Sequence, residues 1–104
     1  MYMDSMFDGC NSIESLDLSS FKTPSLKTIS NMFNTCYKLK DLNIINFNTT
    51  LVEDMGKTFD QCWSLTSINL THFDTKSLTI MYHMFYNCSS LKYIDLSSFD
   101  TSRV

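Results

Sequence analysis

The sequence predicts an α/β solenoid in which four 26-residue units stack side by side, each adding a short helix and a short strand. Two observations carry this prediction. The four cysteines, at positions 10, 36, 62 and 88, lie 26 residues apart, and folding the 104-residue chain at that period aligns all eight phenylalanines in two columns. The units run over about 1–26, 27–52, 53–78 and 79–104. With one proline and two glycines there is no linker, so we expect a single domain.

The helix is predicted from apolar spacing, which is plainest in the fourth unit. Met81, Met84, Phe85, Cys88 and Leu91 follow the spacing i, i+3, i+4, i+7 and i+10. This spacing is typical of a helix with one buried face. We therefore expect a short helix over about 81–91 and at the equivalent positions of the other units.

The strand is predicted from the residues that follow. Ile94 and Leu96 alternate with Tyr93, Asp95 and Ser97, as in a strand with one buried face. Stacking would place these strands in a parallel ladder, with the helices on the other face. The spacing L-x-x-I-x-L-x-x-F from residue 91 to residue 99 also matches the leucine-rich-repeat pattern, with phenylalanine at its last position.

The first and last units lack polar capping sequences, so each would expose an apolar face at an end of the stack. We expect these residues to be an excerpt of a longer array. If the chain stood alone, we would expect its uncovered ends to fray or to associate end to end.

Charge and hydropathy exclude several classes of partner. Eight lysines and arginines against eleven aspartates and glutamates give a net charge of -3, and the lysines are scattered, which argues against nucleic acid binding. No apolar run approaches the roughly 18 residues of a membrane span, and no secretion signal lies within the chain. We expect no cofactor and no membrane insertion by this segment.

The evenly spaced cysteines are interpreted as buried thiols that fill a column of the core. Zinc ligands usually lie two to four residues apart, whereas no two cysteines here are closer than 26, so no metal site is expected. A disulfide between adjacent coils stays open as a minor alternative.

The sequence predicts no enzyme and no catalytic residues. His83 precedes Cys88 by five residues, which on a helix would place the two side chains about 140° apart. No Ser-His-Asp or paired-carboxylate arrangement can be built from positions that the repeat brings together.

Two groups of outward residues are candidates for protein binding. The first lies along the predicted ladder, where it forms either a solubilising hydrogen-bonding column or part of a ligand surface: Asp17, Asn43, Asn69 and Asp95, with Tyr93 beside them. The second is aromatic and varies between units. Tyr37 and Trp63 share a column, and Tyr82 and Tyr86 share one outward helical face. Partial packing against neighbouring coils is the alternative for these rings.

The segments YIDLSSFDTS and MFYNC, together with LDLSSFKTPSLKTISNMFNTCYKL earlier in the chain, closely resemble the BspA-like leucine-rich repeats, which are related to the mycoplasma surface-lipoprotein repeat. The resemblance implies a secreted or cell-surface location and adhesion to a protein of a host or neighbouring cell. We therefore expect a non-enzymatic protein-binding or adhesion module. The alternatives are a spacer or stalk without its own ligand, and an intracellular interaction scaffold.

Overall fold

The computed structural model describes all residues 1–104, and it contains no helix. Its only strands are β1 (Ser15–Asp17) and β2 (Asp41–Asn43), which pair in parallel with Ser15 opposite Asp41. The prediction of an α/β leucine-rich-repeat solenoid with helices on one face is therefore wrong. Residues 67–69 and 93–95, at the positions equivalent to β1 and β2, form no strand.

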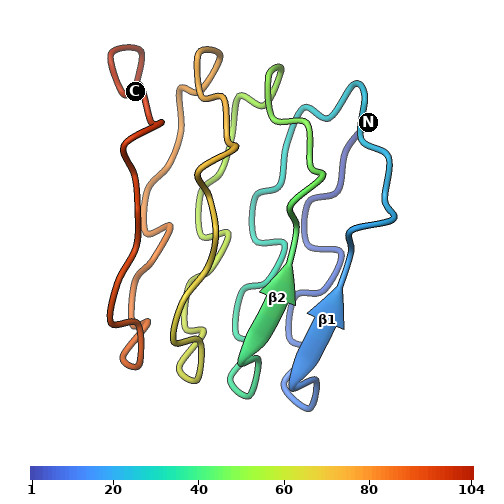
Figure 1. The fold of residues 1–104 in the computed structure, drawn as a ribbon, viewed down its shortest axis with the longest axis vertical. Helices are drawn as coiled ribbons and strands as arrows, with labels where there is room; N and C mark the ends of the chain where they lie inside the picture. The colour runs from blue at the N-terminus through green and yellow to red at the C-terminus, as the bar shows by residue number, and fades with distance from the viewer.

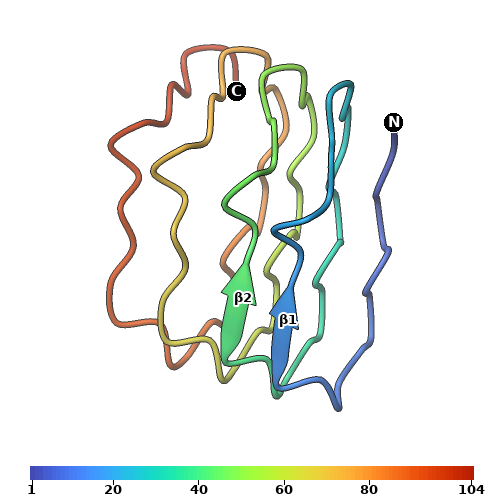
Figure 2. The ribbon, with the colours of Figure 1, turned by 45° about the vertical axis from the view of Figure 1, so that its right-hand side comes forward.

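The 26-residue period appears in space as four successive turns of the chain, which we call coil 1 (1–26), coil 2 (27–52), coil 3 (53–78) and coil 4 (79–104). The coils lie side by side in chain order, and the two termini belong to opposite ends of the row (Figures 1 and 2). Isolated parallel bridges connect equivalent residues of all four coils: Tyr2, Thr28, Asp54 and Ile80. Each coil therefore contacts its neighbours in sequence.

The backbone of the predicted helical segment bonds between coils instead of along a helix. In coil 2 the N–H groups of Phe33 and Thr35 donate to Thr58 O and Asp60 O of coil 3, at 3.0 and 2.8 Å. Intervening residues close short turns, as where Met32 N–H donates to Ile29 O at 3.0 Å. Because every second N–H leaves its own coil, the continuous i to i−4 ladder of an α-helix cannot form.

Left-handed backbone conformations reinforce this difference. Positive φ angles between 51° and 73° recur at 26-residue intervals, at Ser5, Asn31, Lys57 and His83 and at Gly9, Thr35, Gln61 and Asn87. A right-handed helix excludes such residues, whereas a series of tight turns uses them. The turns nevertheless bury the same i, i+3, i+4 and i+7 positions that a helix would, since Ile29, Met32, Phe33 and Cys36 are all buried.

The core consists of equivalent side chains stacked from coil to coil. Phe7, Phe33, Phe59 and Phe85 form one aromatic column, with successive ring centroids 5.8, 5.7 and 5.5 Å apart and nearly parallel planes. Phe33 and Phe59 are fully buried, whereas Phe7 and Phe85 at the two ends are only partly covered. Offset stacking of this kind adds to the free energy gained by burial.

A column of buried threonines also joins neighbouring coils. Thr49 Oγ1 donates to Asp74 O at 3.1 Å and accepts the Asp74 N–H at 2.9 Å. Thr75 makes the same pair of bonds with Asp100, at 3.2 and 2.7 Å. Both hydroxyls are thereby satisfied inside the protein, where an unpaired polar group would be costly.

Candidate functional site

The four cysteines are free thiols inside the coils. The Sγ of Cys36, Cys62 and Cys88 each donates to a phenylalanine carbonyl of the preceding coil, at 3.2, 3.2 and 3.0 Å. Burial raises the pKa of Cys36 to about 11 and also raises the pKa of Cys62 and of Cys88. Thiols that stay protonated at neutral pH are poor nucleophiles. The prediction of buried thiols is confirmed for Cys36 and Cys62, whereas Cys10 and Cys88 are only partly buried.

His83 and Cys88 have separate surroundings, although not for the reason that helical geometry predicted. His83 is exposed, and its ring stacks on Tyr86 with centroids 4.7 Å apart. Cys88 is directed at Phe59 O in coil 3. No group of three or more His, Cys, Asp or Glu side chains is arranged to hold a metal ion. The structure also has no helix long and apolar enough to cross a membrane.

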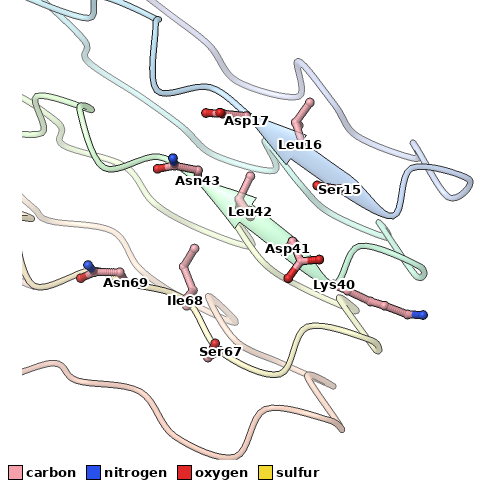
Figure 3. A pocket seen from close by; sticks show the side chains of 10 residues that line it. All are labelled: Ser15, Leu16, Asp17, Lys40, Asp41, Leu42, Asn43, Ser67, Ile68 and Asn69. Carbon is pink, nitrogen blue, oxygen red and sulfur yellow. The ribbon is translucent and has the colours of Figure 1, made fainter.

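A shallow hollow of about 400 Å³ lies over β1, β2 and the equivalent residues of coil 3. Figure 3 shows its lining as parallel rows that cross the three coils. Leu16, Leu42 and Ile68 make the apolar row; the polar rows are Ser15, Asp41 and Ser67, and Asp17, Asn43 and Asn69, with Lys40 at one edge. Asp95 and Tyr93 line an adjoining hollow of about 330 Å³ together with Asn69. The structure thus places the predicted ladder residues along one face.

The Asp and Asn residues of this face have a local role in turns. Oδ1 of Asp17, Asn43, Asn69 and Asp95 accepts the backbone N–H two residues later, at 2.9 to 3.1 Å. The side chain and then the backbone N–H of Ser19 lower the pKa of Asp17, and Ser97 acts in the same way on Asp95. These side-chain bonds stay within one coil, so the carboxylate and amide groups of the column close a turn in each coil.

Tyr37 and Trp63 form an aromatic pair between coils 2 and 3. Their ring centroids are 4.2 Å apart with the planes tilted by 34°. Tyr37 is half-buried, and about half of Trp63 is exposed. Packing between coils and exposure to solvent therefore coexist in this pair.

Coil 4 carries an exposed aromatic cluster, Tyr82, His83 and Tyr86. The His83 ring lies 5.8 Å from Tyr82 and 4.7 Å from Tyr86, and the two tyrosines are 54% and 53% exposed. A Cβ atom on Gly56 of coil 3 would lie 2.6 Å from Cε1 of Tyr82, so the Tyr82 ring occupies the space that this glycine leaves open.

Sequence reasoning identified Tyr82 and Tyr86 but missed His83 and Gly56. Gly56 shares a repeat column with Tyr82, together with Asp4 and Ser30. The only sign of this contact in the sequence was that Gly56, which has no side chain, and the large Tyr82 occupy neighbouring positions of that column.

These features define a tandem-repeat protein with a thiol- and phenylalanine-lined core and exposed aromatic side chains. Over residues 1–104 the chain matches the family described as "Mycoplasma protein of unknown function, DUF285", and it belongs to that family. No curated protein and no solved structure matches the chain significantly. The match confirms the mycoplasma-type part of the resemblance, whereas the BspA-like part stays a prediction.

Proposed function

We propose that the chain is a non-enzymatic protein-binding module of a secreted or cell-surface protein, and that the cluster Tyr82, His83 and Tyr86 is its principal contact. The observation that carries the proposal is that two large tyrosine side chains remain half exposed next to a stacked histidine. Aromatic side chains of this kind are favoured anchors in protein interfaces.

The position of Tyr82 against Gly56 supports this role. A ring that already lies in a defined place loses little conformational freedom when a partner binds, so more of the contact energy contributes to affinity. Tyrosine also offers a hydroxyl at the edge of an apolar ring, which suits a contact surface that is wet in the free protein.

The surface location and the adhesive role come from the relationships of the chain. It belongs to a mycoplasma-type family, and its segments resemble the BspA-like repeats, which implies attachment to proteins of a host or a neighbouring cell. The proposed ligand is accordingly a protein. The alternatives are a spacer without a ligand and an intracellular scaffold, and the experiments below distinguish them from a surface binding module.

Biolayer interferometry of the immobilised chain against a panel of purified extracellular matrix proteins tests the binding role. We expect the double variant Tyr82→Ala and Tyr86→Ala to weaken binding by about tenfold or more, with unchanged circular dichroism and melting temperature. Tyr93→Ala is the matched control, because Tyr93 is an exposed tyrosine of the same coil on the face that holds the hollows.

Each result separates the alternatives. Loss of binding with Tyr93→Ala alone would move the contact to the strand side, and a wild-type chain that binds no panel protein would favour the spacer. Protease treatment of intact cells checks the location, since a surface segment is cleaved and an intracellular one is not.

A further inference from the structure

The larger hollow, over β1, β2 and coil 3, is a trough between two rows of outward side chains. In each strand the first and third residues are exposed, whereas the middle residue, Leu16 or Leu42, packs against the core. One wall of the trough is the row Ser15, Asp41 and Ser67, and the other is the row Asp17, Asn43 and Asn69 (Figure 3). Residues two apart on a strand are separated by about 7 Å, so the trough admits one slender chain lying across the coils.

Asn43 and Asn69 present hydrogen-bond donors to this trough in a fixed direction. Their Oδ1 atoms accept the backbone N–H groups of Ile45 and Thr71, both at 3.1 Å, and these bonds orient the amide groups. Both side chains are exposed, and their Nδ2 groups donate to no other atom of the protein. Each therefore offers two N–H donors to a ligand with little loss of side-chain freedom on binding.

Acceptors and hydroxyls lie beside these donors. Asp17 adds a carboxylate to the wall that holds the two amides. On the opposite wall the exposed carboxylate of Asp41 lies between the exposed hydroxyls of Ser15 and Ser67. A surface that mixes donors and acceptors so closely suits ligand groups that both donate and accept, which is the chemistry of a sugar hydroxyl.

The backbone and the charge of the trough argue against other ligands. β1 and β2 pair with each other, and the trough crosses their faces, so a peptide cannot join the sheet here as an additional strand. Lys40 is the only basic residue of the lining, against two carboxylates, so the trough lacks the positive charge that attracts a polyanion. The ligand that fits is neutral and rich in hydroxyl groups.

From this chemistry we propose that the trough binds a neutral oligosaccharide lying across coils 1 to 3, with the amides of Asn43 and Asn69 and the carboxylate of Asp41 bonded to its hydroxyls. The adjoining hollow extends the trough into coil 4, where Tyr93 lines it together with Asn69. An aromatic ring there offers an apolar surface to the C–H face of a sugar. None of these residues belongs to the cluster Tyr82, His83 and Tyr86, so the site does not depend on the proposed protein-binding role.

A microarray of neutral oligosaccharides, followed by calorimetric titration with the one that binds most strongly, tests the proposal. Asn43→Asp and Asn69→Asp should each weaken binding by about tenfold or more, because each exchanges two donors for an acceptor. Both variants keep the Oδ1 that closes the turn, as Asp17 and Asp95 do in the same column. Circular dichroism checks that the fold is unchanged.

Asn48→Asp is the matched control. Asn48 is exposed, and its Oδ1 accepts the Thr50 N–H at 3.1 Å in a turn of the same kind, but it does not line the trough. This variant adds the same charge to coil 2 as Asn43→Asp, and we expect it to bind the oligosaccharide as the wild type does. The double variant Tyr82→Ala and Tyr86→Ala should also leave oligosaccharide binding unchanged.

Three results would overturn the proposal. One is a wild-type chain that binds no neutral oligosaccharide on the array. Another is a preference for sulphated oligosaccharides or for polylysine, which would assign the trough to a charged ligand. The third is an equal loss of binding with Asn48→Asp and Asn43→Asp, which would attribute the effect to charge and not to the amide donors.

Discussion

The inner coils 2 and 3 and the outer coils 1 and 4 carry the same apolar columns but bury them to different extents. Leu70 in coil 3 is fully buried, whereas Leu96, its equivalent in coil 4, is 37% exposed. Phe47 in coil 2 is 3% exposed, whereas Phe21 in coil 1 is 37% exposed. A 26-residue unit therefore does not bury its own residues; its neighbours do, as expected when stability is a sum of interfaces between adjacent repeats.

The phenylalanine column allows the largest test of this difference. Phe59→Ala should lower the free energy of unfolding by about 3–5 kcal/mol, because Phe59 is fully buried between two rings. Phe85→Ala in coil 4 should cost clearly less, since that ring has one neighbour and is partly exposed. Urea unfolding followed by circular dichroism measures both, and equal losses would refute the contrast.

The threonine column allows a second test of the difference between inner and outer coils, with polar side chains and a smaller expected effect. Thr49→Val removes two hydrogen bonds and leaves the half-buried N–H and carbonyl of Asp74 unpaired, so we expect a loss of about 1–3 kcal/mol in the free energy of unfolding. Thr101→Val, at the exposed equivalent in coil 4, should change it by no more than about 0.5 kcal/mol. Thermal and urea unfolding of the two variants measure both losses. A loss for Thr101→Val as large as that for Thr49→Val would contradict the dependence on neighbouring coils.

Left-handed backbone positions should not follow the inner and outer division, because their strain is local. Gln61→Gly in coil 3 and Ser5→Gly in coil 1 both place glycine where φ is 59° and 56°. Each should raise the free energy of unfolding by about 0.5–1 kcal/mol, the relief of left-handed strain less the extra entropy of glycine. A gain confined to one coil would show that the strain depends on stacking.

The pH dependence should be the smallest effect. Burial lowers the pKa of His72 in coil 3, against the opposing influence of its 2.9 Å bond to Ile44 O. The unfolded chain, with a histidine pKa of about 6.5, then binds more protons than the folded chain, so stability falls as pH drops from about 7 through that value.

Three aspartates, Asp17, Asp95 and Asp100, have a lowered pKa and titrate at lower pH than His72. Asp95 in coil 4 has a lowered pKa, so its contribution is complete above about pH 4 and is lost only as pH falls further. Urea unfolding at a series of pH values, repeated with His72→Gln, distinguishes the loss of stability near pH 6.5 from the loss below about pH 4. If the His72→Gln variant still lost stability near pH 6.5, His72 would be excluded as the cause.

The positions of the core could be predicted from the sequence, whereas the backbone that carries them could not. Tandem turns and a helix bury the same spacing, as at Ile29, Met32, Phe33 and Cys36, so apolar spacing alone does not separate them. Gly9, Asn31 and Asn87 tolerate a left-handed conformation well, and their places in two columns were the available sign of turns.

The candidate site could also be predicted from the sequence only in part. Outward aromatic residues such as Tyr82 and Tyr86 follow from the repeat, because the other members of their columns are small or polar. The placement of Tyr82 over Gly56 could not be predicted, since it depends on how closely coils 3 and 4 approach each other. The local bonding of Asp17 and Asp95 depends likewise on turns that were expected to be strand.

Amide hydrogen exchange, measured by NMR at a concentration where the chain is monomeric, tests most directly whether neighbours protect each coil. The N–H of Phe33 donates to Thr58 O, and that of Phe59 to Met84 O, whereas that of Phe85 has no acceptor. We predict strong protection at Phe33, somewhat less at Phe59, and exchange at Phe85 within about tenfold of an unstructured chain. Comparable protection at all three amides would contradict the account.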